Sequence, residues 1–257
     1  MVTTKIGTHT VEYYDTIDEL PMVRFHKYQK YLLIDAGVGA DIASFDRRIE
    51  KARRFIMAGK GDKAQQELEN LRQCVFLLQN ELTPKHLAFA VLVTRIDGQE
   101  CNDLSDEALR GVLDRLAETP YSKLTAHLEA VKKKIDDELV LYFPSLFDNS
   151  SVKEYFDLLR QRTLAVLKGI VEGKDDPEGT EEAERLTTAL VTYSNPQIFS
   201  GSGGVEVQFD RNFENLCLAL SEQLNVRPKE YTVLEFYNAF DFVQERAKAT
   251  ERAKRPR

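Results

Sequence analysis

The feature that most constrains the fold of this chain is an apolar stripe in residues 122–141. Five apolar residues recur there at steps of three or four: Leu124, Leu128, Val131, Ile135 and Leu139. Because an α-helix has 3.6 residues per turn, this near-heptad spacing places all five on one helix face. Pro144 cannot continue the helix. The segment therefore predicts one long helix whose apolar face packs in a bundle or coiled coil.

Comparable stripes predict helices along most of the chain. They cover residues 22–36, 41–57, 63–81, 106–117, 152–172, 181–193, 213–224 and 233–248. In residues 41–57 the apolar residues at helical spacing are Ile42, Phe45, Ile49, Ala52 and Ile56. In residues 63–81 the residues predicted to face inward are Leu68, Leu71, Val75 and Leu78. We expect the first three helices to form one antiparallel cluster.

Two segments have the composition of strands. Residues 8–14 are rich in Thr, Val and Tyr, which favours a short extended segment. Residues 205–209 alternate in polarity after the glycine-rich residues 201–204, which predicts a small β-hairpin near residues 197–209. Residues 92–96 are too few for periodicity to separate helix from strand. The predicted fold class is mainly α: a multi-helix bundle with a short N-terminal extended segment and the small β-hairpin.

A polar segment divides the chain. Residues 174–180 contain Asp175, Asp176 and Pro177 and are short of apolar anchors, which is typical of a linker. We therefore predict an N-terminal helical domain over residues 1–173. A C-terminal helical domain, which contains the β-hairpin, follows over residues 181–257.

Composition and charge favour a folded protein without a broad nucleic-acid-binding face. The 257 residues are 42% hydrophobic and 30% charged, with a formal net charge of -7. Clustered cations, on which nonspecific nucleic-acid binding depends, are confined to the end of the chain. That basic stretch comprises Arg246, Lys248, Arg252, Lys254, Arg255 and Arg257. It is either a solvated helix end, which cations suit, or a contact for phosphate or an acidic partner.

Targeting and membrane signals are not evident in the sequence. Residues 1–10 have no apolar run after their lysine, and no stretch reaches the roughly 18 apolar residues of a membrane span. The three cysteines, Cys74, Cys101 and Cys217, are odd in number and far apart, which argues against a disulfide framework. We expect a soluble protein with reduced thiols in the cytoplasm.

Reactive groups are sparse. The four histidines, His9, His26, His86 and His127, lie in separate segments without the spacing of a metal site. The glycines of residues 201–204 lack the lysine and hydroxyl of a phosphate-binding loop. No local motif marks a nucleophile with its base. We therefore expect no catalytic residue, no metal and no cofactor. The alternative is a helical enzyme whose site is assembled from distant residues.

Aromatic residues are the leading candidates for contact with a partner protein, because they bury a large area at a small entropic cost. Residues 142–147 are aromatic and apolar outside a clear helix, so they either plug the core or meet another subunit. The aromatic stripe of the last helix leaves the same two options. With two basic positions of the tail, the candidate contacts are Tyr142, Phe143, Phe147, Phe236, Tyr237, Phe240, Arg252 and Arg255.

Two segments resemble phage proteins. Residues 92–98 read LVTRIDG and are followed by Leu104, Ser105, Asp106 and a helix through Leu113 and Leu116. This order is similar to the core, IDG turn and short amphipathic helix of phage tail and baseplate assembly proteins. Residues 231–240, YTVLEFYNAF, resemble the end of tail assembly chaperones, where a hydroxyl-capped helix carries acidic and aromatic positions. The resemblance implies a virion or virion-assembly protein with protein partners, and it transfers no catalytic residue.

The sequence therefore favours a non-enzymatic protein-interaction component of a large assembly. The specific expectation is a phage tail, neck or baseplate structural or assembly protein. Its expected partners are other structural or assembly proteins, with homo-oligomerisation as an open option, and neither a membrane nor nucleic acid is expected. If the protein is phage-encoded, its place is the host cytoplasm or the virion. Besides the helical enzyme, the alternative is a regulator that contacts nucleic acid through the basic C-terminus.

Overall fold

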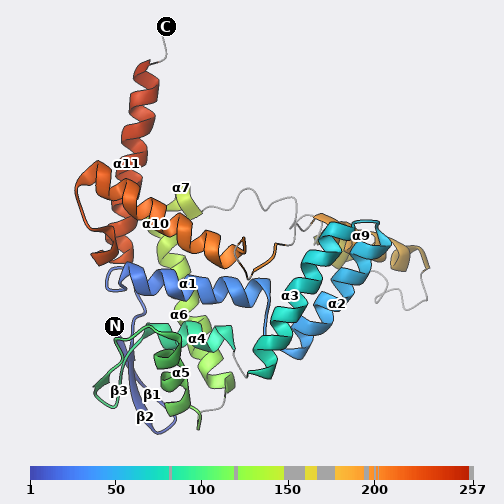
Figure 1. The fold of residues 1–257 in the computed structure, drawn as a ribbon, viewed down its shortest axis with the longest axis horizontal. Helices are drawn as coiled ribbons and strands as arrows, with labels where there is room; N and C mark the ends of the chain where they lie inside the picture. The colour runs from blue at the N-terminus through green and yellow to red at the C-terminus, as the bar shows by residue number, and fades with distance from the viewer. Residues whose placement is uncertain are drawn as a thin grey trace.

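The computed structural model describes residues 1–80, 83–118, 121–147, 160–166, 177–193, 197–199, 201 and 203–254. Over these residues the protein is mainly helical with one small antiparallel sheet, which confirms the predicted fold class (Figure 1). The helices are α1 (Met22–Gly37), α2 (Ile42–Met57), α3 (Gly61–Gln79), α4 (Pro84–Leu92), α5 (Asp106–Arg115), α6 (Tyr121–Tyr142), α7 (Pro144–Phe147), α9 (Pro177–Tyr193), α10 (Val205–Leu224), the 3-10 helix η2 (Pro228–Glu230) and α11 (Val233–Lys254). Residues 160–166 are also helical. None of these described helices is both long and apolar enough to cross a lipid bilayer.

A four-stranded sheet forms one end of the molecule. Its strands are β1 (Val2–Ile6), β2 (His9–Tyr13), β3 (Val93–Ile96) and β4 (Gln99–Glu100), which are antiparallel and follow the order β1-β2-β3-β4. β2 confirms the extended segment expected in residues 8–14. The sequence left helix or strand open for residues 92–96, and the structure contains both. Leu92 ends α4, and the next four residues form β3. Ile96 of β3 pairs with Val11 of β2.

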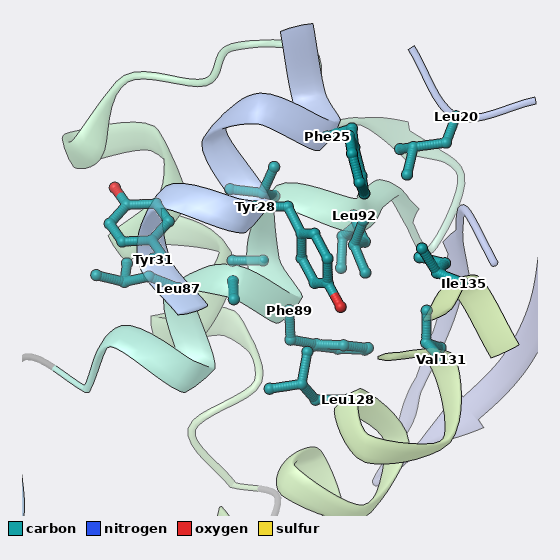
Figure 2. Packing of buried hydrophobic residues seen from close by; sticks show 14 of the residues in the cluster. Leu20, Phe25, Tyr28, Tyr31, Leu87, Phe89, Leu92, Leu128, Val131 and Ile135 are labelled. Carbon is teal, nitrogen blue, oxygen red and sulfur yellow. The ribbon is translucent and has the colours of Figure 1, made fainter. Parts of the chain in front are cut away.

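Helix α4 lies at the centre of the hydrophobic core. All of its residues except Lys85 are buried, so it presents almost no face to solvent. It packs against α1, α5 and α6. Figure 2 shows Phe89 of α4 between Tyr28 of α1 and Leu128 of α6. A helix that is apolar on every side is stable only inside such a shell, so the other elements are arranged around it.

Arg24 of α1 is a buried cation inside this core. Its Nη1 donates to the carbonyl oxygens of Val91 (2.7 Å) and Val93 (3.0 Å), and its Nη2 donates to that of Cys101 (2.7 Å). Burial lowers the pKa of the guanidinium. The last carbonyls of a helix lack partners within the helix and carry the negative end of its dipole, so a cation is well placed there. Arg24 therefore joins α1 to the point where α4 continues into β3.

The C-terminal helices pack on α1. The backbone N–H of Met22 donates to the carbonyl of Tyr231 (2.8 Å), which ties the start of α1 to the start of α11. His26 stacks on Phe209 and Phe213 of α10, with ring centroids 4.5 and 4.1 Å apart. The far end of α11 projects away from the body (Figure 1).

The β-hairpin predicted near residues 197–209 is wrong. Residues 205–209 begin helix α10, whose N-cap is Gly204. Val205 and Phe209 are four residues apart, so they also fit one helix face, and five residues are too few for alternation to decide. Phe209 and Phe213, again four residues apart, both stack on His26. A helix places both rings on the same face, which this double contact requires.

The division into two domains stays a prediction. Of the linker residues 174–180, the last four lie in α9, and residues 174–176 lie outside the described residues. The hydrophobic core contains residues from both predicted domains, such as Phe25 and Phe236. α9 in turn contacts α2.

The first three helices do not form one antiparallel cluster as predicted. α1 packs chiefly on α4, whereas α2 and α3 pack on each other and extend beside the body (Figure 1). We call α2 and α3 together the arm. The reason for the difference is α4, whose largely apolar surface takes the inward face of α1.

The segment before α10 fixes the arm to the body. Asn70 of α3 donates through Nδ2 to the carbonyl of Gln197 (2.7 Å) and accepts a hydrogen bond from the N–H of Phe199 (3.1 Å). The buried ring of Phe199 lies against Gly37, the last residue of α1. A Cβ atom built on Gly37 would lie 1.6 Å from Cζ of that ring, so any larger residue at this position must displace the ring.

Replacing Arg24 by methionine should destabilise the protein, because two buried carbonyl groups and a partly buried one would lose their donor. We expect the free energy of unfolding to fall by about 3 kcal/mol or more, the scale seen when one side of a buried charged network is removed. Arg72→Met is the matched control, since Arg72 is exposed and its pair with Glu69 contributes little. Urea unfolding followed by circular dichroism measures both variants. Equal losses would contradict the structural role of Arg24.

Gly37→Ala should displace Phe199 and loosen the arm. Overpacking a close contact costs about 1–3 kcal/mol, so we expect a loss of unfolding free energy in that range. Gly111→Ala in α5 is the control, because nothing lies within 4 Å of its added Cβ. Alanine there should be neutral or stabilise the helix by up to about 1 kcal/mol. Thermal unfolding compares the two; a Gly37→Ala protein as stable as the parent would contradict the contact.

Candidate interaction surface

A buried ion pair holds the interior of the arm. Arg48 of α2 donates through Nη1 to Glu67 of α3 (2.7 Å) and through Nε to the carbonyl of Val38 (2.8 Å). Both charged side chains are buried. The short connection between α2 and α3 makes the helices antiparallel neighbours. The remaining buried residues of the two helices are Ser44, Ala52, Phe55, Ala64, Asn70, Cys74 and Leu77.

The stripe of α3 that was predicted to face inward is wrong at Leu68, and three of the five stripe residues of α2 are exposed. Ile42, Ile49 and Ile56 of α2 are 75%, 44% and 62% exposed, and Leu68 of α3 is 45% exposed. Ala52 is buried as expected, whereas Phe45, Leu71, Val75 and Leu78 are half-buried. The physical reason is the ion pair: Arg48 and Glu67 satisfy each other only when they face one another. This orientation turns the apolar stripes by about 100°, one residue of helix, away from the contact.

The two exposed stripes lie on the same side of the arm. Ile49 follows Arg48 by one residue, and Leu68 follows Glu67 by one residue. Because the helices are antiparallel and Arg48 faces Glu67, a rotation of one residue on each helix leads to the same side. We call this side the apolar face. It consists of Ile42, Ile49, Ile56 and Leu68, with the half-buried Phe45 and Val75 between them and the interior.

The described residues leave the apolar face uncovered. α9 packs on α2 from another side, where Arg54 forms an ion pair with Glu184 (2.8 Å) and donates to Thr188 (3.3 Å). Arg54 is five residues from Ile49, which is about 140° around the helix. A row of exposed isoleucines on a helix that is already packed elsewhere is typical of a docking surface.

Charges of opposite sign border the apolar face on α2. Asp46 and Arg53 are exposed and follow Ile42 and Ile49, respectively, by four residues. Arg53 donates to Glu50 (2.9 and 3.0 Å), and these hydrogen bonds lower the pKa of the Glu50 carboxyl. Within the described part of the chain, Asp46 has no ion-pair partner. Since an exposed pair such as Arg53 and Glu50 is weak, both border charges are available to a partner.

The aromatic residues predicted as partner contacts pack largely on one another. The ring of Tyr237 in α11 lies 5.5 Å from that of Phe143, 5.1 Å from that of Phe147 and 5.7 Å from that of Phe236. Burial raises the pKa of Tyr237 to about 12. Phe143 and Phe236 are buried, so for these two residues the core-packing option holds: Phe143 lies between α6 and α7, and Phe236 also packs on Phe213 of α10.

The other predicted contact residues lie at or beyond the edge of this cluster. Phe240 is half-buried, and Tyr142 is exposed beside the exposed Leu141 at the end of α6. Arg252 lies in α11, and Arg255 lies outside the described residues. A role for these residues as partner contacts stays a prediction.

A groove of about 680 Å³ lies between the arm and the body. Its lining includes Tyr31 of α1, Arg72 of α3 and Asp106 of α5. Tyr31 Oη and Lys27 Nζ each donate to Asp106 (2.8 Å), so these polar groups hold α5 against α1. Burial works against ionisation of Asp106, but these hydrogen bonds keep the pKa of its carboxyl below the usual value. The groove is lined by charged residues of both signs as well as by apolar ones.

Two histidine–aspartate pairs connect elements of the fold. His26 Nε2 lies 3.0 Å from Asp210, whose second oxygen accepts from Lys30 Nζ (2.7 Å), and this cluster joins α1 to α10. Burial lowers the pKa of His26, and Asp210 opposes this effect. His9 Nδ1 lies 2.6 Å from Asp97 at the turn after β3. Among the residues that the structure describes, no group of three or more His, Cys, Asp or Glu side chains is arranged to hold a metal ion.

No protein-family model matches the chain, and no curated protein or solved structure matches it significantly. The apolar face of the arm was not predicted from the sequence, in which its isoleucines were noted only as a stripe at helical spacing. A signal for it is present in the sequence, since Ser44, Arg48 and Phe55 form a second stripe beside the isoleucines.

Removing one partner of the buried ion pair should cost more than removing both. Glu67→Leu leaves the Arg48 guanidinium buried without its carboxylate, so we expect the free energy of unfolding to fall by about 3–5 kcal/mol. The double variant Arg48→Met, Glu67→Leu replaces the pair by apolar side chains and should lose less than the single variant. Chemical denaturation of both single variants and the double variant measures the coupling. Additive losses would contradict a coupled pair.

Proposed function

We propose that this chain is a non-enzymatic protein-interaction component of a large assembly, and that it binds its partners through the apolar face of the arm. The observation that carries the proposal is the exposure of Ile42, Ile49 and Ile56 on a helix whose other side is already packed. Full burial of one such side chain is worth about 1.5–3 kcal/mol. The strip therefore favours association, and a partner helix is the simplest shape to cover it.

The arm is suited to present this face. It stands beside the body rather than within it, and its interior is fixed by the pair of Arg48 and Glu67 (Figure 1). Asn70 and Phe199 anchor it to the body. A surface held in place before binding loses little conformational entropy when a partner docks, which supports tight association.

We further propose, on the resemblance of residues 92–116 and 231–240 to phage proteins, that the assembly is a phage tail, neck or baseplate. Both segments lie in the body: the first forms the end of α4, β3, β4 and α5, and the second forms the start of α11. They would build the scaffold that carries the arm, while the arm supplies the contact.

Ile49→Glu tests the proposed function, because a carboxylate in the middle of the apolar face has no counterpart across a dry interface. Ala43→Glu is the matched control: it adds the same side chain to an exposed position of α2, about 120° from Ile49 around the helix. Tagged protein is isolated from the cells that make it, and the mass of its complexes is measured by size-exclusion chromatography with light scattering.

We expect the parent and Ala43→Glu proteins to elute in complexes heavier than the single chain, and Ile49→Glu to elute alone. If Ile49→Glu keeps the same complexes, the apolar face is not the binding site. A parent protein that is always a single chain without partners would contradict an interaction function altogether.

A further inference from the structure

We propose that the partner on the apolar face is a second copy of this chain, docked so that the two α2 helices run antiparallel about a two-fold axis at Ile49. This inference rests on the proposed function and names the partner of the same surface. It is carried by the order of apolar and charged residues along α2 and by the side of α2 that α3 already occupies.

Helix α2 carries a heptad repeat with one side still free. Isoleucine occupies the a positions 42, 49 and 56, and Phe45 and Ala52 occupy the d positions. The g positions, Arg48 and Phe55, are buried against α3. The e positions, Asp46 and Arg53, are exposed. A second helix that covers the isoleucines therefore approaches α2 over the a positions and the e side.

The isoleucine stripe is complementary to itself. Two antiparallel helices related by a two-fold axis at residue 49 place residue 49−n of one copy opposite residue 49+n of the other. Ile49 then meets the partner's Ile49, and Ile42 meets the partner's Ile56. A closed dimer with one self-complementary patch is the commonest form of homo-oligomer. This arrangement covers all three exposed isoleucines at once.

The border charges select the antiparallel direction. With the axis at Ile49, Asp46 lies opposite the partner's Ala52, one residue from the partner's Arg53. One residue is about 1.5 Å along the helix, so the carboxylate and guanidinium are within reach of each other. Symmetry produces this pair twice. A parallel pair in register would instead place residues of equal number side by side, and the complementarity would be lost.

The same placement is compatible with the rest of the arm. α9 contacts α2 through Arg54, on the side away from Ile49, and therefore leaves the approach open. Leu68 of α3, on the same side as Ile49, extends the apolar surface that the partner copy covers. Two arms packed in this way form a four-helix bundle, which is a stable way to bury such surfaces.

The first experiment measures the mass of the purified full chain by sedimentation equilibrium over a range of concentrations. We expect a monomer–dimer equilibrium for the parent protein and for Ala43→Glu. Ile49→Glu should weaken the dimer about 100-fold or more, because both copies bring a carboxylate to the centre of the interface. Ile49 is exposed in the single chain, so this change leaves the fold intact.

The second experiment exchanges the border charges. Asp46→Arg and Arg53→Asp should each weaken the dimer about tenfold, since each creates two like-charged contacts. The double variant should recover the parent affinity. An equimolar mixture of the two single variants should form heterodimers, because opposite charges then meet across the axis. Recovery in both cases requires Asp46 and Arg53 to meet between copies, which loss of folding does not mimic.

A cysteine at the axis tests the geometry directly. Ile49→Cys in a Cys101→Ser background should form a disulfide-linked dimer with oxidised glutathione, since the axis brings residue 49 next to its copy. Ala43→Cys in the same background should not. Cys74 and Cys217 are buried and do not compete.

The outcomes separate the two proposals. A parent protein that stays monomeric at all concentrations, while Ile49→Glu still removes complexes with other proteins, overturns self-association and leaves the interaction function standing. A dimer unaffected by Ile49→Glu and by the charge exchange overturns the placement of the interface on α2. A dimer that responds to both, with cross-linking at residue 49, supports the inference.

Discussion

The enclosure of helix α4 is the constraint on which the rest of the structure depends. Its side chains are apolar almost all round, so α1, α5 and α6 must surround it. Its last carbonyls also need donors, and Arg24 supplies them for Val91 and Val93 while reaching Cys101 as well. One side chain of α1 therefore sets both the position of α1 on α4 and the connection to the sheet. α10 and α11 then pack on the surface of α1 that remains.

The arm is arranged in the opposite way to the core around α4: charged side chains lie in its interior, and apolar side chains lie on its surface. Its interior contains Arg48 and Glu67, while Ile42, Ile49 and Ile56 are left in water. A buried ion pair contributes little net stability but penalises every arrangement in which one charge lacks the other. It thus fixes the orientation of α2 on α3. The apolar area that folding leaves exposed is available for association, which is the physical basis of the proposed function.

Local signals in the sequence located most helices correctly. Asp41 and Ser105 accept hydrogen bonds from the N–H groups of Ser44 and Ala108, as expected of helix caps, and α6 buries its predicted stripe. The prediction of a β-hairpin was wrong because alternation over five residues fits a strand and a helix equally well. For the aromatic residues of 142–147 and of α11, the sequence left core packing and partner contact both open, and Phe143 and Phe236 pack inside. Aromatic composition reports a tendency to be buried and does not say against what.

Periodicity and capping depend on residues that are close together in the sequence. The amino-acid sequence alone therefore determines that the protein is mainly helical and where most of its helices begin and end. The direction in which a stripe faces is a long-range property. In α2, the isoleucines and the stripe of Ser44, Arg48 and Phe55 are neighbouring faces of one helix, and either could face inward. The stripe with Arg48 faces inward because Glu67, nineteen residues away, supplies the carboxylate that makes burial of its charge tolerable. Tertiary packing, and not the local pattern, therefore decides that the apolar face is a surface.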